Sequence, residues 1–359
     1  MRVRREHGAR YTDDIIRHFR HPKAAMSTFA ILLLMLIVIL IAAEVFTNAL
    51  EHLGEKLKIS EGVTGSLFAA IGTALPETMV PLLALMAGTS NTAVNEEIGV
   101  GAILGAPLML STLSICLMAL AVLKKRGARG HLVPERTGLI RDLNFFLAAF
   151  SFSAIALFVP HQLTEIRAAI GLTLVLTYFI YIMLTLRASD HLVKEGHGTE
   201  AEEKMFLCRM GLPENVAAIL AQLALGLALL VAGAKGFIHG VEGASELLGI
   251  SPLLLSLLII PIATELPEKV NSILWIRRRK DTLAFGNITG AMVFQGTMLP
   301  AIGIMLTPWE PRHEVLLGIV ITLLASLWLR IMAHRGQLKV WHLAVNGTMY
   351  VTYLAVVLS

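Results

Sequence analysis

The pentapeptide TALPE at residues 73–77 returns as TELPE at residues 264–268, with four of its five positions unchanged. A second pair of related stretches follows, GAILGA at residues 101–106 and GNITGA at residues 286–291. Apolar helices share Leu and Ile by composition, but composition does not explain a shared proline followed by a shared glutamate. The chain therefore contains an internal repeat.

The composition is that of a membrane protein. Of the 359 residues, 55% are hydrophobic and 16% are charged, whereas roughly a quarter of the residues in soluble domains are charged. A helix that spans a bilayer needs about 20 mostly apolar residues. Apolar runs of this length exclude a soluble enzyme, a disulfide scaffold, a disordered chain and a transmembrane β-barrel, whose strands alternate in character. We expect an all-α integral membrane protein.

Ten apolar segments are candidates for membrane spans. They are residues 27–50, 63–88, 98–123, 143–159, 168–186, 216–238, 252–275, 283–306, 314–333 and 338–358. Five spans, an odd number, separate the two copies of the repeat, so the second copy enters the membrane from the opposite side. The predicted fold is therefore ten transmembrane helices in two inverted-topology repeats of five, with helices two and seven broken by proline.

The loops predict how the chain is divided and oriented. We expect a basic N-terminal segment (1–25), a first half of five spans (26–186), a polar cytoplasmic linker (187–214) and a second half of five spans (215–359). Lys and Arg concentrate in the loops after the odd-numbered spans, whereas the opposite loops carry only Arg167 and Arg312. By the positive-inside rule, both termini then lie outside a plasma or bacterial inner membrane. The basic first segment argues against this orientation, unless translation starts at Met26 rather than Met1, which the sequence leaves open.

Each proline of the repeat stands in mid-span, where it removes a backbone donor and clashes with the carbonyl four residues earlier. It would free the carbonyls of Gly72 and Ala263 and perturb those of Thr73 and Thr264. In lipid, freed carbonyls are tolerated only where a polar group meets them. Both repeats therefore predict a polar interruption near the membrane midplane.

A glutamate follows each proline directly. A carboxylate at this depth is costly unless it is paired or functional, and Glu77 and Glu268 recur at equivalent positions. Two carboxylates with threonine hydroxyls and loosened carbonyls make an oxygen-only site suited to Ca²⁺ or Na⁺, whereas Zn²⁺ or copper would require His or Cys. A simpler interpretation is a kinked helix whose carboxylate reaches an interface. It explains one copy more easily than two related copies.

Two glycine pairs stand one span after the prolines. Gly101 with Gly105, and Gly286 with Gly290, form small-xxx-small faces that permit close approach of helices. We expect spans three and eight to press against the broken helices and to complete the site.

The repeated motifs resemble those of the calcium/cation antiporter superfamily, the sodium/calcium-exchanger-like membrane proteins. Members carry G-T-S-x-P-E in the second span of each half, and residues 72–77 and 263–268 read GTALPE and ATELPE. The next span of the family carries a G-N-x-x-G-S-N-x-F-N-like stretch, and residues 286–295 read GNITGAMVFQ. The resemblance covers nearly the whole chain and implies a secondary cation antiporter.

The resemblance also implies a set of metal ligands. In the family the two motif glutamates bind the transported Ca²⁺, a role that would fall to Glu77 and Glu268. The motif threonines assist them, and here these are Thr73 and Thr264. Asn287, which is retained from the later motif, joins these predicted metal ligands.

Three polar residues depart from the family pattern. Glu265 stands where the motif has serine, and Gln295 replaces an asparagine. Lys269 stands four residues after Glu265, so an ion pair that neutralises this carboxylate is geometrically available. Alternatively, the ammonium replaces one transported cation and leaves a simpler exchange cycle. Glu265, Lys269 and Gln295 are therefore candidates for coupling or charge compensation.

The predicted function is secondary-active antiport of Ca²⁺ against Na⁺ or H⁺ by alternating access, with Glu77 and Glu268 at the membrane midplane. Two carboxylates in one dry site repel each other, so uptake of protons in place of Ca²⁺ is physically natural. The alternative is a Na⁺/H⁺ antiporter that uses the same carboxylate pair. Ala74, Ala102 and Ala106 stand where the family pattern has polar residues, so fewer polar ligands are left for Ca²⁺. This adds weight to the alternative.

Other classes of function fit less well. An intramembrane hydrolase is disfavoured because the sequence has no H-E-x-x-H motif and no evident Ser-Lys or Ser-His pair. We therefore expect no enzyme activity and no cofactor, only transported cations. The expected partners are inorganic cations and the lipid bilayer, not nucleic acid. A monomer is compatible with this fold, although the sequence does not determine the oligomeric state, the stoichiometry or the direction of transport.

Overall fold

The computed structural model describes residues 22–56, 77–86, 88–193, 204–336 and 338–359. The secondary-structure elements in these ranges are helical, apart from one isolated bridge between His131 and Lys339. The helices are α2 (Pro22–Lys56), α4 (Thr92–Met109), α5 (Ile115–Arg126), α6 (Arg136–Ile155), α7 (Thr164–Val193), α8 (Phe206–Arg209), α9 (Val216–Leu248), α10 (Pro252–Thr264), α11 (Leu266–Arg277), α12 (Asp281–Leu306), α13 (His313–His334) and α14 (Val340–Val357). A π-helical turn, Leu110–Ser114, joins α4 to α5, and a 3₁₀ turn, Ala156–Phe158, follows α6. Residues Glu77–Met86 are also helical.

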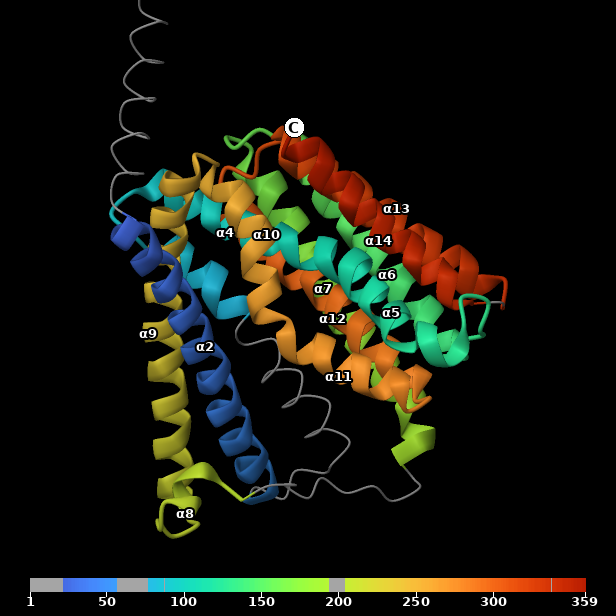
Figure 1. Cartoon of the computed structure of the whole chain (residues 1–359), viewed down its shortest axis with the longest axis horizontal. Coiled ribbons are helices and arrows are strands. Elements are labelled where there is room, and N and C mark those ends of the chain that lie inside the picture. Colours follow the sequence, from blue (N-terminus) through green and yellow to red (C-terminus); the bar gives the residue numbers. More distant parts are fainter. Residues whose placement is uncertain (1–21, 57–76, 87, 194–203, 337) are drawn as a thin grey trace, which may run out of the picture.

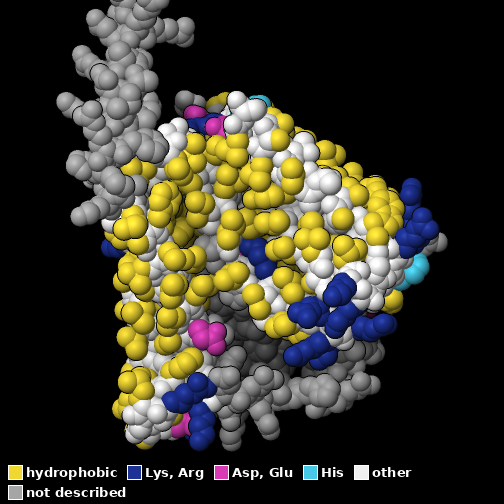
Figure 2. Space-filling view, in the orientation of Figure 1, with side chains coloured by type: hydrophobic (Ala, Val, Ile, Leu, Met, Phe, Trp, Pro, Cys, Tyr) yellow, Lys and Arg dark blue, Asp and Glu magenta, His cyan; other side chains and the backbone are white. Residues whose placement is uncertain are grey.

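Eight helical runs among the described residues are long and apolar enough to cross a membrane. They are Met26–Ala49, Thr92–Arg126, Arg136–Phe158, Thr164–Thr185, Val216–Leu248, Asp281–Leu306, His313–His334 and Val340–Val357. Apolar side chains cover most of the face shown in Figure 2, as expected of a surface that contacts lipid tails. The prediction of an all-α, multi-pass integral membrane protein is confirmed.

The two other expected spans, 63–88 and 252–275, contain only shorter apolar helices in the described ranges, Glu77–Met86 and Pro252–Ile262. The second of these spans is divided at Glu265, with backbone angles φ −98° and ψ 13°. Helix α10 ends just before this residue, and α11 begins just after it. Pro267 stands in the first turn of α11, where its missing N–H is harmless.

Helices α2 and α9 form a close pair at one edge of the molecule and extend beyond the other helices (Figure 1). Three glycines of α9, Gly226, Gly233 and Gly240, recur every seven residues and face α2. A Cβ atom added at Gly226 would lie 2.9 Å from Phe46 Cβ, closer than two side-chain carbons normally approach. The absence of side chains along this seam lets the two long helices pack almost backbone to backbone.

Helix α4 packs against α10 through the first glycine pair. A Cβ atom at Gly101 would lie 1.9 Å from Ser256 Oγ, and one at Gly105 would lie 2.2 Å from the Leu257 carbonyl oxygen. The expected contact of span three with a broken helix is therefore confirmed for this pair.

The second glycine pair makes no comparable contact within the described part of the chain. A Cβ atom at Gly290 would meet only Tyr181 Oη, at 3.7 Å, and one at Gly286 would have no described atom within 4 Å. One of the two broken helices, span two, has residues 57–76 outside the described residues, so the contact expected of the second glycine pair stays a prediction.

Two buried arginines hold the ends of α12, which contacts α4, α6, α7 and α11. At its start, Arg126 of α5 makes two hydrogen bonds of 2.8 Å to the carboxylate of Asp281. At its end, Arg167 of α7 donates to the carbonyls of Thr307 and Pro308, where a positive charge complements the helix terminus. Arg167 is thus a buried residue in the first turn of α7 and not the loop residue that the sequence suggested.

We expect Gly105→Ala to destabilise the protein by about 1–3 kcal/mol, the usual result of overpacking a close contact. The added methyl group would meet the backbone of α10, which cannot rotate away. Gly318→Ala is the matched control, because a Cβ atom there lies 3.6 Å from Tyr353, an ordinary contact. Thermal unfolding of the purified variants in detergent would measure both. Equal melting temperatures for the two variants would contradict the close packing of α4 on α10.

Candidate cation-binding site

A buried amide joins two buried carboxylates among these helices. Gln295 Nε2 donates hydrogen bonds to Glu77 Oε2 at 3.1 Å and to Glu265 Oε1 at 2.5 Å. Glu265 and Gln295 have no exposed surface, and Glu77 is 5% exposed. Ionised groups at this depth in an apolar protein are retained where they are paired or functional. We refer to Glu77, Gln295 and Glu265 as the carboxylate–amide cluster.

Each member of the cluster comes from a different element. Glu77 is the first described residue of the helical segment Glu77–Met86. Glu265 occupies the junction between α10 and α11, so the break in this span places its carboxylate inside the protein. Gln295 lies in the middle of α12, whose two ends are fastened by arginine. The cluster therefore forms where the broken span and α12 meet the segment that follows the first proline.

The cluster offers oxygen atoms to a cation. Gln295 Oε1 is buried and accepts no hydrogen bond from the described residues. Buried acceptors normally have a partner, and an exception calls for one that is absent, such as an ion. Carboxylate and amide oxygens are the ligands that Ca²⁺ and other hard cations prefer. The geometry therefore suits a cation that binds between the two carboxylates.

A lysine stands one helical turn beyond Glu265. The side chain of Lys269 is buried, and its Nζ donates to the Pro261 carbonyl oxygen at 2.7 Å and lies 3.0 Å from Met109 Sδ. Pro261 belongs to the last turn of α10. The ammonium group therefore sits at the C-terminal, electronegative end of a half-helix.

Two predicted ligands, Thr264 and Asn287, form side-chain hydrogen bonds in the described structure. Thr264 is buried, and its hydroxyl donates to the Ile260 carbonyl of its own helix at 3.2 Å. Asn287 of α12 donates from Nδ2 to Ser272 Oγ of α11 at 3.0 Å. Ser272 is fully buried, and the sequence did not single it out. Its only signal was its position, seven residues after Glu265 and on the same span.

Two other predicted ligands lie beyond what the structure describes. Thr73 falls in the range 57–76, outside the described residues. Glu268 belongs to α11, but its side chain is outside the described part. The pairing of Glu77 with Glu268 therefore stays a prediction. Among the described residues, no three His, Cys, Asp or Glu side chains converge as a metal site.

Asp142 is a further buried carboxylate, and it binds α12 from another side. Asp142 of α6 accepts hydrogen bonds from Thr289 Oγ1 of α12 at 2.8 Å and from Tyr181 Oη of α7 at 3.1 Å. Arg141 lies 3.6 Å from the same carboxylate. The sequence did not single out Asp142, because it directly precedes the apolar segment 143–159 and resembles an ordinary interfacial charge. The tertiary contacts instead make it a link between three helices.

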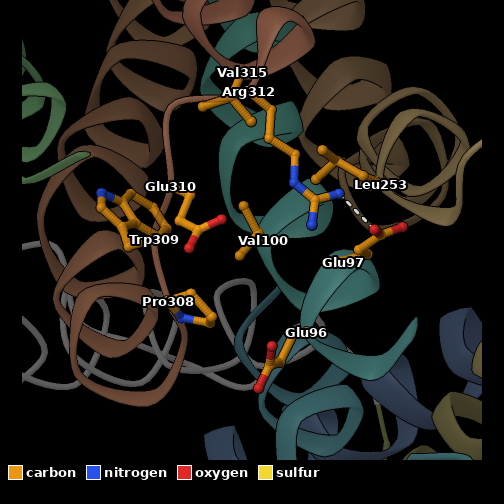
Figure 3. Close-up of a pocket in the computed structure, with 9 residues that line it drawn as sticks. All are labelled: Glu96, Glu97, Val100, Leu253, Pro308, Trp309, Glu310, Arg312 and Val315. Atoms are coloured by element: carbon orange, nitrogen blue, oxygen red, sulfur yellow. Dashed lines mark hydrogen bonds and ion pairs between the residues drawn. The ribbon is translucent and has the colours of Figure 1, made fainter. Parts of the chain in front are cut away.

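A pocket opens where the first turns of α4, α10 and α13 come together (Figure 3). Glu96, Glu97 and Glu310 line it together with Arg312, and Val100, Leu253, Pro308, Trp309 and Val315 complete its wall. Arg312 Nη1 forms an ion pair with Glu97 Oε1 at 2.5 Å, and this hydrogen bond raises the pKa of the guanidinium. The pair connects the segment between α12 and α13 to the first turns of α4. With three carboxylates and one guanidinium, the pocket has a negative charge.

Most of the chain matches the sequence model of one protein family. A family model described as sodium/calcium exchanger protein matches residues 27–187 and 218–359. The chain belongs to the sodium/calcium exchanger family. The resemblance to the calcium/cation antiporter superfamily, drawn from the repeated motifs, is thereby confirmed. Members of the family are transporters.

Individual relatives cover most of the chain. Sodium/calcium exchanger MaX1 of Methanosarcina acetivorans is 24% identical over 352 residues, which are 91% of this chain and 97% of that protein. Inner membrane protein YrbG of Escherichia coli is 26% identical over 283 residues, 78% of this chain and 80% of that protein. The crystal structure of an H⁺/Ca²⁺ exchanger, CAX, matches with a TM-score of 0.66 at 16% identity, over 97% of this chain and 89% of that one. This structural likeness shows a shared fold.

Replacing Gln295 with Met would remove the donor that Glu77 and Glu265 share while keeping a side chain of similar size. We expect a loss of stability of about 1–3 kcal/mol in cation-free buffer at neutral pH, because ionised carboxylates lose a buried donor. The loss should shrink in mild acid, since a protonated carboxyl group can donate to its neighbour.

Thermal unfolding in detergent at both pH values would measure this effect. Thr297→Val is a suitable control, because within the described residues the Thr297 hydroxyl donates to carbonyls of its own helix, those of Val293 and Phe294. A loss in Gln295→Met that is equal at neutral and acid pH would mean that the amide does not stabilise ionised carboxylates.

Proposed function

We propose that this chain is a secondary-active antiporter that exchanges Ca²⁺ for Na⁺ or H⁺ by alternating access. The observation that carries this proposal is the carboxylate–amide cluster, a set of buried oxygen ligands in a chain of the sodium/calcium exchanger family. The names of two relatives support it, since MaX1 is a sodium/calcium exchanger and CAX exchanges H⁺ for Ca²⁺.

The proposed Ca²⁺ site combines side chains of the two broken helices with one of α12. Its ligands are Glu77, Glu268, Thr73, Thr264 and Asn287, and Gln295 joins Glu77 to the further carboxylate of Glu265. Calcium takes six to eight oxygen atoms, and carboxylates can supply two each. Backbone carbonyls loosened by the prolines would complete the coordination shell.

Gln295 has a role of its own in this proposal. Without a cation, its NH₂ group satisfies both Glu77 and Glu265. A cation between these carboxylates would repel the NH₂ group and attract Oε1, the oxygen that accepts no hydrogen bond from the described residues. Rotation of the amide by a half-turn exchanges the two atoms. The same side chain would therefore stabilise both the cation-free and the cation-bound site.

The architecture that we propose is ten helices in two inverted repeats of five, with the second and seventh broken at proline. The match of the family model in two segments, residues 27–187 and 218–359, supports this division. The junction of α10 and α11 at Glu265 supports the break in the seventh helix. In an inverted repeat, rocking of one part against the other exposes a midplane site to each side in turn.

The remaining proposals follow from topology and family. Both termini would lie outside, with residues 187–214 in the cytoplasm. An inner membrane location is consistent with the name of YrbG, an inner membrane protein. The chain would need no cofactor and no partner other than the lipid bilayer and the transported cations.

Uptake of ⁴⁵Ca²⁺ into proteoliposomes, with outward Na⁺ and H⁺ gradients imposed separately, tests the proposal. We expect one gradient to drive uptake and the other to have little effect. Glu77→Gln should reduce the driven uptake about tenfold or more, since loss of a charged ligand costs about 1.5–3 kcal/mol. Glu165→Gln is the control, because Glu165 is exposed in the first turn of α7.

Absence of Ca²⁺ flux under both gradients would contradict calcium exchange. If Na⁺-dependent proton movement then remained intact and required Glu77, the result would select Na⁺/H⁺ antiport at the same carboxylates. Equal loss of uptake in both variants would show that the assay does not report on the site.

A further inference from the structure

The two copies of the repeat differ by one pair of charges. At an offset of 191 residues, Glu265 corresponds to Ala74 and Lys269 corresponds to Thr78. The second half therefore carries a carboxylate and an ammonium group where the first half has two uncharged residues. Since the two charges are opposite, they leave the net charge of the region unchanged.

The ammonium group occupies a position that suits a free cation. Lys269 Nζ donates to the carbonyl of Pro261, in the last turn of α10. The carbonyls in the last turn of a helix carry a partial negative charge, and the Pro261 carbonyl accepts both the Lys269 ammonium and the backbone N–H of Glu265. In transporters with broken helices, such half-helix ends coordinate Na⁺. Here the ε-ammonium of a lysine takes that place, with the soft sulfur of Met109 on its other side.

The carboxylate that accompanies it has a different partner from the ammonium group. Glu265 accepts a hydrogen bond from Gln295, which connects it to Glu77. The extra negative charge thus belongs to the carboxylate–amide cluster, whereas the extra positive charge stands at the end of α10.

We propose that Lys269 is a tethered cation that permanently fills one monovalent cation position of the exchanger. This inference rests on the proposed function and specifies its coupling. With Glu268 as a ligand, as proposed above, the site holds three carboxylates, Glu77, Glu265 and Glu268, and one ammonium group, which leaves two negative charges. One Ca²⁺ or two monovalent cations balance them, so the exchange is electroneutral. With an uncharged residue at position 269, a third monovalent cation would be needed.

Lys269→Met tests this inference, because it removes the charge and keeps an unbranched apolar chain. In the absence of Ca²⁺, we expect the purified Lys269→Met variant to bind one more ²²Na⁺ per molecule than the unaltered protein. For a proton-driven exchanger, one more proton should be taken up when Ca²⁺ is chelated. The double variant Glu265→Ala/Lys269→Thr copies the first repeat and should restore the original number, as should Lys269→Arg.

An unchanged number of bound cations in a monodisperse Lys269→Met protein would overturn the tethered cation. If Lys269→Met alone did not fold, the comparison of the double variant with Glu265→Ala would decide, with one fewer monovalent cation expected in Glu265→Ala. These measurements do not depend on transport. If the unaltered protein moved no Ca²⁺, calcium exchange would fail while the binding result for Lys269 would still stand.

Discussion

Carboxylates buried among apolar helices need donors or cations close by, and this need organises the centre of the protein. Glu77 and Glu265 come from segments almost two hundred residues apart, and one amide group serves both. That amide is useful only if α12 holds it in place. The ends of α12 are bound by Arg126 and Arg167, through a carboxylate at one end and through carbonyls at the other. These contacts at the two ends of α12 hold the helix that carries Gln295.

The break between α10 and α11 is the second feature on which the site depends. An unbroken helix satisfies its own carbonyls and presents only side chains to its neighbours. At Glu265 the chain instead ends one helix and starts another inside the protein, which turns a carboxylate inward and leaves the end of α10 to be met by Lys269. Gly101 and Gly105 let α4 pack closely against α10. This packing places Met109, the last residue of α4, beside the ammonium group.

The helices were largely predictable from the sequence, because twenty apolar residues in a row admit few structures other than a membrane span. The motifs also marked Glu77, Glu265, Lys269 and Gln295 as unusual, since each interrupts an apolar run. The contacts between them were not predictable. Helical spacing suggested only a pairing of Glu265 with Lys269. The bond from Gln295 to Glu265 and the bond from Lys269 to the Pro261 carbonyl depend on how the helices pack and on where α10 ends, which helical spacing does not predict.

By itself, the sequence determined that this is a multi-pass membrane protein with an internal repeat, because hydrophobicity and repetition are properties of the chain alone. It also determined the family, since the repeated motif is specific. Only the tertiary structure decided which polar groups meet. Asp142 and Ser272 are ordinary residues in the sequence, and they become links between helices only because α6, α7, α11 and α12 pack together. A hydrogen bond needs two partners within about 3 Å, and residues distant in the sequence reach that separation only through the fold.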